Sequence, residues 1–170
     1  MPVNSVQTYL TGLLNGLPLP AEPGQQGALE CVITPPDPGD LDAPKAYLWP
    51  GSGEETRLTP PRAGGPNVIA PGWKQITHKV DLYLAWVGAA DDPQADTNFP
   101  AVVDAVMAAL RPSTDEVLIT DPVTGVISSL LLGIGEEMSY EFAVLHTLAD
   151  QAYLRYDARL TINVIEYFQS

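Results

Sequence analysis

Three side chains in the sequence have the types that nucleophilic catalysis requires: Cys31, His78 and His146. A cysteine hydrolase needs a thiolate paired with an imidazole that a third group orients. Cys31 lies in the predicted strand 28–33, where a lone cysteine is most often a small core residue. The alternation of apolar residues around His78 directs that imidazole to the inner side of another strand. We therefore expect no catalytic residues and no enzymatic activity.

The acidic and glycine-rich runs of the chain do not match a metal or phosphate motif either. Residues 90–96, Ala-Asp-Asp-Pro-Gln-Ala-Asp, lack the glycine and the final glutamate of a calcium loop. The run Gly-Ile-Gly-Glu-Glu at 133–137 lacks a third glycine, and two adjacent carboxylates would repel an anion. We expect a solvated loop and a turn at these places, with no cofactor and no bound metal.

Composition and charge narrow the possible partners. The 170 residues contain 21 Asp and Glu but only 8 Lys and Arg, which gives a net charge of -13. The few cations are scattered, so they form no stripe that could neutralise the phosphates of nucleic acid. The start of the chain has no signal-peptide pattern, and no apolar run is long enough to span a bilayer. These features indicate one domain, 1–170, without specific DNA binding or membrane contact.

Periodicity predicts the secondary structure. Apolar spacings of three and four predict amphipathic helices at 4–15 and 99–111, with Asn98 as a cap for the second. Strict alternation predicts strands at 76–87 and 154–164, and a turn at 121–125 predicts a hairpin between 117–120 and 126–134. Residues 140–148 fit a strand or a helix. The expected fold class is α+β, an antiparallel β-sheet with both helices packed on one face.

A long proline- and glycine-rich segment, 35–72, separates the first predicted strand from the central one. Its 38 residues hold nine prolines and six glycines, which predicts an extended loop with at most a short strand at 45–49. We interpret this segment as an interaction arm, although a surface insertion without a partner is the alternative. Aromatic and arginine side chains are the usual anchors of interfaces. The predicted partner interface consists of Trp49, Arg57, Arg62 and Trp73.

Three segments together carry a family resemblance. The first is the amphipathic start, Val-Asn-Ser-Val-Gln-Thr-Tyr-Leu-Thr-Gly-Leu-Leu. The second is the strand His-Lys-Val-Asp-Leu-Tyr-Leu-Ala-Trp, followed by an acidic loop and the helix Phe-Pro-Ala-Val-Val-Asp-Ala-Val-Met-Ala-Ala-Leu. The third is the final strand, Tyr-Asp-Ala-Arg-Leu-Thr-Ile-Asn-Val-Ile-Glu-Tyr. In the order and the residue patterns of these segments, the chain resembles the tail terminator, or tail-completion, proteins of long-tailed bacteriophages.

The resemblance implies a structural virion protein of the tail and neck, assembled in the host cytoplasm. Such a protein forms a homohexameric ring that caps the tail tube, stops polymerisation of the major tail tube protein and joins the tail to the head-tail connector, or head completion protein. DNA would pass through the lumen without specific binding. Two alternatives stay open: another head-tail connector or minor tail protein, and an acidic inhibitor or immunity-type binding module. Oligomeric state separates the second alternative from a ring.

Overall fold

The computed structural model describes residues 2–19, 27–35, 37, 44–57, 73–111, 117–120, 123, 125–134, 136–148 and 152–169. Within these residues, strands make up 56% and two helices account for most of the rest of the regular structure. The elements in chain order are α1 (Pro2–Leu14), β1 (Glu30–Val32), β2 (Lys45–Arg57), β3 (Trp73–Ala89), α2 (Ala95–Leu110), β4 (Val117–Thr120), β5 (Ile127–Leu132), β6 (Met138–Leu148) and β7 (Tyr153–Gln169).

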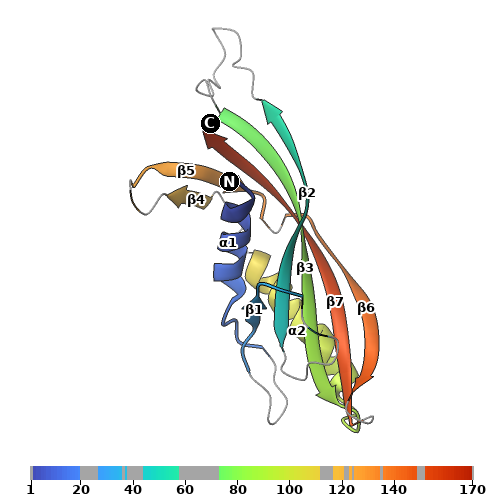
Figure 1. Ribbon diagram of the computed structural model, residues 1–170. Helices are drawn as coiled ribbons and strands as arrows, with labels where there is room; N and C mark the ends of the chain where they lie inside the picture. Colours follow the sequence, from blue (N-terminus) through green and yellow to red (C-terminus); the bar gives the residue numbers. More distant parts are fainter. Residues whose placement is uncertain are drawn as a thin grey trace.

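The seven strands form one sheet that is organised around β7. The strand order is β1-β2-β3-β7-β5-β4, and β6 pairs with β7 outside this path. One edge of β7 pairs with β3 along its whole length. Its other edge is shared, because β6 pairs with the first part of β7 and β5 with the last part. The sheet twists and curls around the helices, as Figure 1 shows.

The predicted antiparallel sheet is wrong, because the sheet is mixed. β1 and β2 run parallel, with Glu30 opposite Lys45 and Val32 opposite Tyr47. Parallel neighbours need a long connection between them, and twelve residues separate Val32 from Lys45 in the sequence. The fold is also dominated by strands, so α+β describes it only as a coarse mixture of helix and sheet.

Both helices contribute to one hydrophobic core on the same side of the sheet (Figure 1). The inward side of α1 supplies Val6, Leu10 and Leu14, all with side chains at most 1% exposed. On α2, Phe99 packs between two rings of the sheet, with centroids 6.0 Å from Trp86 and 5.2 Å from Tyr156. We call this side of the sheet the inner face and the opposite side the outer face.

The middle of the proposed arm is a strand, which corrects the prediction of a long loop at 35–72. β2 pairs with β3 from Lys45 to Arg57, with a bulge between Pro50 and Ser52. β1 covers the other edge of β2 only as far as Tyr47, so Pro50 lies where β2 has one described neighbour. Proline is tolerated at such edges and at bulges. Residues 58–72 of the arm lie outside the described residues.

The alternating strands and the hairpin are confirmed; the alternating strands are longer than predicted, and the second strand of the hairpin is shorter than the predicted 126–134. β3 and β7 extend the predicted strands at both ends, β4 and β5 form the predicted hairpin, and the ambiguous 140–148 segment belongs to β6. The predicted helix cap is wrong. α2 begins at Ala95 after the N-cap residue Gln94, whose N–H donates to the Asp92 carboxylate at 2.9 Å.

Gly88 provides a test of how tightly this core is packed. A Cβ atom at Gly88 would lie 2.9 Å from the Trp86 ring and 3.1 Å from the Cβ of Ala95. We therefore expect Gly88→Ala to lower the free energy of unfolding by about 1–3 kcal/mol, the usual cost of overpacking. Urea denaturation measures the change. Gly12→Ala in α1 is the matched control, because nothing lies within 4 Å of its added methyl, and it should stabilise the helix by about 0.5–1 kcal/mol. A Gly88→Ala variant as stable as the native protein would contradict this packing.

Candidate functional site

The outer face of the sheet carries three rows of side chains that cross β2, β3 and β7. Residues directly opposite each other in antiparallel strands point to the same face. The register therefore aligns Lys45 with Ala85 and Asp157, Tyr47 with Tyr83 and Arg159, and Trp49 with Asp81 and Thr161. The strands that meet here are far apart in the sequence. Their polar and aromatic residues form one continuous surface opposite the helices.

The aromatic rings of this surface border a groove. The centroid of the Tyr47 ring lies 6.2 Å from that of Trp49 and 6.4 Å from that of Tyr83. The groove has a volume of about 400 Å³, a size typical of small-ligand sites. Trp49 is 50% exposed and Tyr83 is 38% exposed. We call this the aromatic groove; its lining residues are Pro35, Tyr47, Trp49, Tyr83, Leu84, Ala85, Arg155, Asp157 and Ala158.

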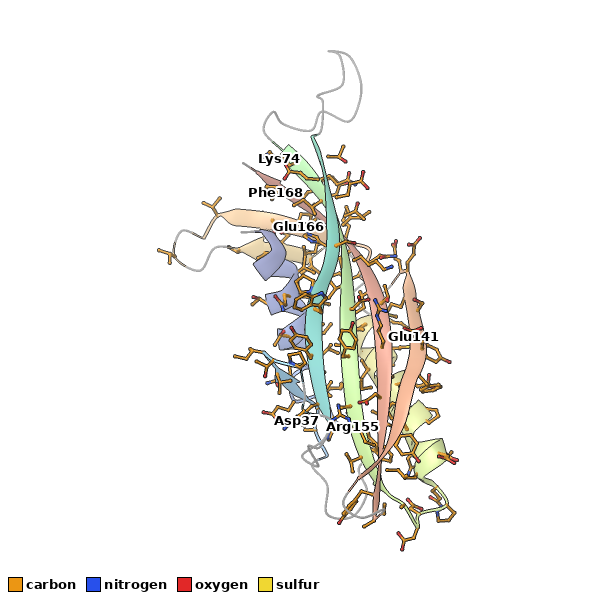
Figure 2. All side chains as sticks on the ribbon, turned by 45° about the vertical axis from the view of Figure 1, so that its right-hand side comes forward. Asp37, Lys74, Glu141, Arg155, Glu166 and Phe168 are labelled. Atoms are coloured by element: carbon orange, nitrogen blue, oxygen red, sulfur yellow. The ribbon has the colours of Figure 1, made fainter. Side chains whose placement is uncertain are left out.

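Arg155 closes one end of the aromatic groove. Its side chain is buried, and its Nε donates to Asp157 at 2.9 Å while its Nη1 donates to the backbone carbonyl of Asp37. Figure 2 shows Arg155 and Asp37 close together near the start of β7. The guanidinium thus attaches the segment that follows β1 to the outer face, beside the aromatic rings.

Asp81 and Arg159 form a charged pair on the outer face next to the groove, where they lie opposite its lining residues Trp49 and Tyr83. Arg159 Nη2 donates to Asp81 at 2.6 Å, the Thr161 hydroxyl donates to the same carboxylate at 2.8 Å, and the guanidinium lies over the Tyr83 ring. Gly51 leaves space for the carboxylate, since a Cβ there would lie 3.2 Å from Asp81 Oδ2. A Cβ at Gly51 would also lie 3.1 Å from the backbone carbonyl oxygen of Lys79, so a side chain at this bulge would crowd both atoms.

The pair changes the ionisation of both groups. Burial alone would raise the pKa of the Asp81 carboxyl, but the hydrogen bonds from Arg159 and Thr161 outweigh it and hold the pKa below its usual range. The same hydrogen bond and charge raise the pKa of the Arg159 guanidinium. The carboxylate is therefore ionised at neutral pH and fixes the position of Arg159 next to Tyr83.

A second polar pair lies on the inner face. His78 Nε2 is 2.7 Å from Glu166 Oε2, and the two side chains are only 5% and 1% exposed. The sequence placed His78 on the inner side of its strand, and this is confirmed. It did not identify Glu166 as the partner, because the two residues meet only through the β3–β7 register.

The cysteine is not part of this pair. Cys31 lies opposite Ala46, which in turn lies opposite Leu84. Leu84 is six residues along β3 from His78, or about 20 Å at the rise of a strand. Burial, together with the charge of Glu30, raises the pKa of the Cys31 thiol to about 11. The thiol is therefore neutral and distant from the imidazole.

The predicted interface residues separate into two regions. Trp49 lies on the aromatic groove. The backbones of Arg57 and Trp73 lie at the opposite end of the sheet, where Arg57 pairs with Lys74 and Trp73 with Gln169. Arg62 lies outside the described residues. The residues that sequence reasoning missed are Tyr83, Asp157 and Arg159, which belong to the polar sides of two alternating strands.

No family model and no curated protein matches this chain. Within the part of the chain that the structure describes, no cluster of three or more His, Cys, Asp or Glu residues could hold a metal ion. None of the helices in that part is both long and apolar enough to cross a membrane. Among the described residues, the outer face and the aromatic groove are the structural features that bear on function.

The Asp81–Arg159 pair predicts a pH dependence of stability. Because folding lowers the pKa of Asp81, the pair stabilises the fold above the unfolded carboxyl pKa of about 3.9 and loses this effect as the pH falls through the folded value. We expect Asp81→Asn to lower the free energy of unfolding at pH 7 by about 1–2 kcal/mol, and the difference from the native protein to shrink below about pH 4. Urea denaturation across this pH range measures it.

Asp104→Asn on the exposed side of α2 is the control for removal of one negative charge. A difference between Asp81→Asn and the native protein that stays constant from pH 7 to pH 3 would show that the ionised pair is not its source.

Proposed function

We propose that this chain is a tail terminator of long-tailed bacteriophages, a structural virion protein that assembles into a hexameric ring. The ring caps the tail tube, stops its polymerisation and then joins the tail to the head connector. The observation that carries the proposal is the outer face, a broad sheet surface that no described helix covers and that presents exposed aromatic rings.

A ring requires that each subunit offer two different surfaces, because its contacts are head to tail. The outer face of β2, β3 and β7 is one such surface. A second one lies on the inner side of the edge strand β6, where Tyr140 and Phe142 are 51% and 54% exposed and Phe142 touches Phe99 of α2. The two aromatic surfaces lie on opposite faces of the sheet, which suits a subunit with a neighbour on each side.

The shape of the sheet also supports the proposal. The far ends of β2, β3 and β7 extend beyond the helices, as Figure 1 shows. An extended sheet end can contact a neighbouring ring while the helical part packs within its own ring. The high acidity of the chain fits a ring through which DNA passes without being held. These features agree with the order of elements that gives the sequence its resemblance to tail terminators.

The proposal predicts a defined effect on tube assembly. The purified chain is mixed with the major tail tube protein of the same phage, and the products are examined by light scattering and negative-stain electron microscopy. We expect tubes that stop growing and carry a ring of this chain at one end, because capping removes the surface on which the tube polymerises. Light scattering of the capped end complex should give hexameric stoichiometry.

The same experiment can contradict the proposal. Tubes that grow equally long with and without the chain would show that it does not terminate them. A chain that stays a monomer or dimer and instead binds a basic protein would support the inhibitor class.

A further inference from the structure

We propose that the aromatic groove binds the segment Thr59-Pro60-Pro61-Arg62 of a second copy of this chain. The inference rests on the proposed function, since it names the contact by which one subunit of the ring holds the next. The bound segment belongs to a second copy of this chain, and the experiments below distinguish it from a proline-rich segment of another protein.

Two described residues of one proline-rich segment, Pro35 and Asp37, already lie against this groove. After β1 the chain continues as Thr34-Pro35-Pro36-Asp37. Pro35 lines the groove, and the carbonyl of Asp37 accepts a hydrogen bond from Arg155. Proline-rich segments are recognised in this way, because the extended chain leaves its carbonyls free to accept hydrogen bonds and its rings pack on aromatic side chains.

The sequence contains one further segment of the same kind. The order aliphatic residue, threonine, two prolines, charged residue occurs at 33–37 as Ile-Thr-Pro-Pro-Asp and at 58–62 as Leu-Thr-Pro-Pro-Arg. Tandem prolines occur nowhere else in the sequence. The two segments differ in the sign of the final charge, which is negative at Asp37 and positive at Arg62.

The groove offers suitable contacts for the second segment. Tyr47, Trp49 and Tyr83 provide ring surfaces, and Ala85 is the small residue between them and Asp157. The carboxylate of Asp157 is 20% exposed at the edge. The carboxylate already accepts a hydrogen bond from Arg155 Nε. With the prolines against the rings, Arg62 adds a further donor to this carboxylate, whose two oxygens accept several hydrogen bonds, and an acidic residue there offers no such donor.

Chain geometry requires that the segment come from another copy. Arg57 and Lys74 are paired at the far end of the sheet, and Tyr83 lies nine residues along β3 from Lys74. That separation is about 30 Å along the strand. Pro60 is three residues from Arg57, so it can lie at most about 11 Å from it. The segment therefore cannot reach the groove of its own subunit. In an intermolecular contact, each copy binds one neighbour through its groove and another neighbour through its segment.

Mixing two full-length variants tests this contact. The groove variant is Trp49→Ala, which removes an exposed ring, with Ala85→Leu as a second version that fills the groove. The segment variant carries Pro60→Ser and Pro61→Ser. Each variant alone lacks one half of every contact. Together they can form one contact, between the intact segment of the groove variant and the intact groove of the segment variant.

Sedimentation velocity measures the outcome under conditions in which the native chain assembles. We expect each variant alone to weaken assembly by about tenfold or more, and an equimolar mixture to form heterodimers but no larger species. The control Leu118→Ser, on an exposed position of β4, should assemble like the native chain. Variants that assemble normally, or a mixture that stays monomeric, would overturn the inference.

If the isolated native chain is monomeric, a peptide titration tests binding to the aromatic groove instead. The peptide Arg57–Gly65 is added to the full-length chain, and the indole N–H signal of Trp49 is followed by NMR. We expect a saturable shift that disappears with the peptide in which both prolines are serine and weakens when Arg62 is glutamate. No shift would contradict the inference, as would equal binding of all three peptides.

These outcomes are separate from those of the proposed function. Heterodimers in the mixture without capping of tail tubes would leave the groove contact intact and remove the tail terminator function. Capped tubes together with groove variants that assemble normally would support the tail terminator function and remove the groove contact. Binding of a proline-rich peptide from another protein, but not of Arg57–Gly65, would identify a partner other than a second copy.

Discussion

The pairing of β3 with β7 is the constraint on which the rest of the structure depends. The two strands stay in register over seventeen residues, from Trp73 opposite Gln169 to Ala89 opposite Tyr153. A slip by one residue would exchange the two faces of a strand. Leu160 would then leave the core and Arg159 would enter it. The register therefore determines the core, the outer face and the position of the groove together.

Two polar contacts hold this register, one on each face of the same strand pair. His78 and Glu166 meet on the inner face, and Asp81 meets Arg159 and Thr161 on the outer face. His78, Glu166 and Asp81 are buried, and a buried polar group without a partner costs free energy. A shifted register would separate these residues from their partners and is therefore disfavoured. The same contacts that fix the fold also hold the outer face in one arrangement before a partner arrives.

The sequence predicts the elements whose residues alternate or recur regularly, and it fails where pairing overrides local preference. β3 and β7 follow from their alternation alone. β2 does not, because Pro50, Gly51 and Gly53 argue against a strand when taken by themselves. They are tolerated because β3 supplies a long partner and because the bulge makes room for Asp81. The parallel β1 is too short for any pattern to indicate its direction.

The candidate site was predictable only in part for the same reason. Trp49 is conspicuous as a tryptophan in a proline- and glycine-rich segment. Tyr83, Asp157 and Arg159 lie on the polar sides of two strands, where the pattern indicates only a solvated surface. They form a site because β2, β3 and β7 become neighbours, and nothing in the periodicity of one strand shows which strand lies beside it.

The central claim, that the outer face is a subunit contact, is tested most directly by hydroxyl-radical footprinting of Trp49 and Tyr83. Oxidation of these exposed rings is compared between the monomer and the assembled ring by mass spectrometry. If the outer face is the contact, both rings are oxidised in the monomer and protected in the ring. Equal oxidation of Trp49 and Tyr83 in the two states would contradict it.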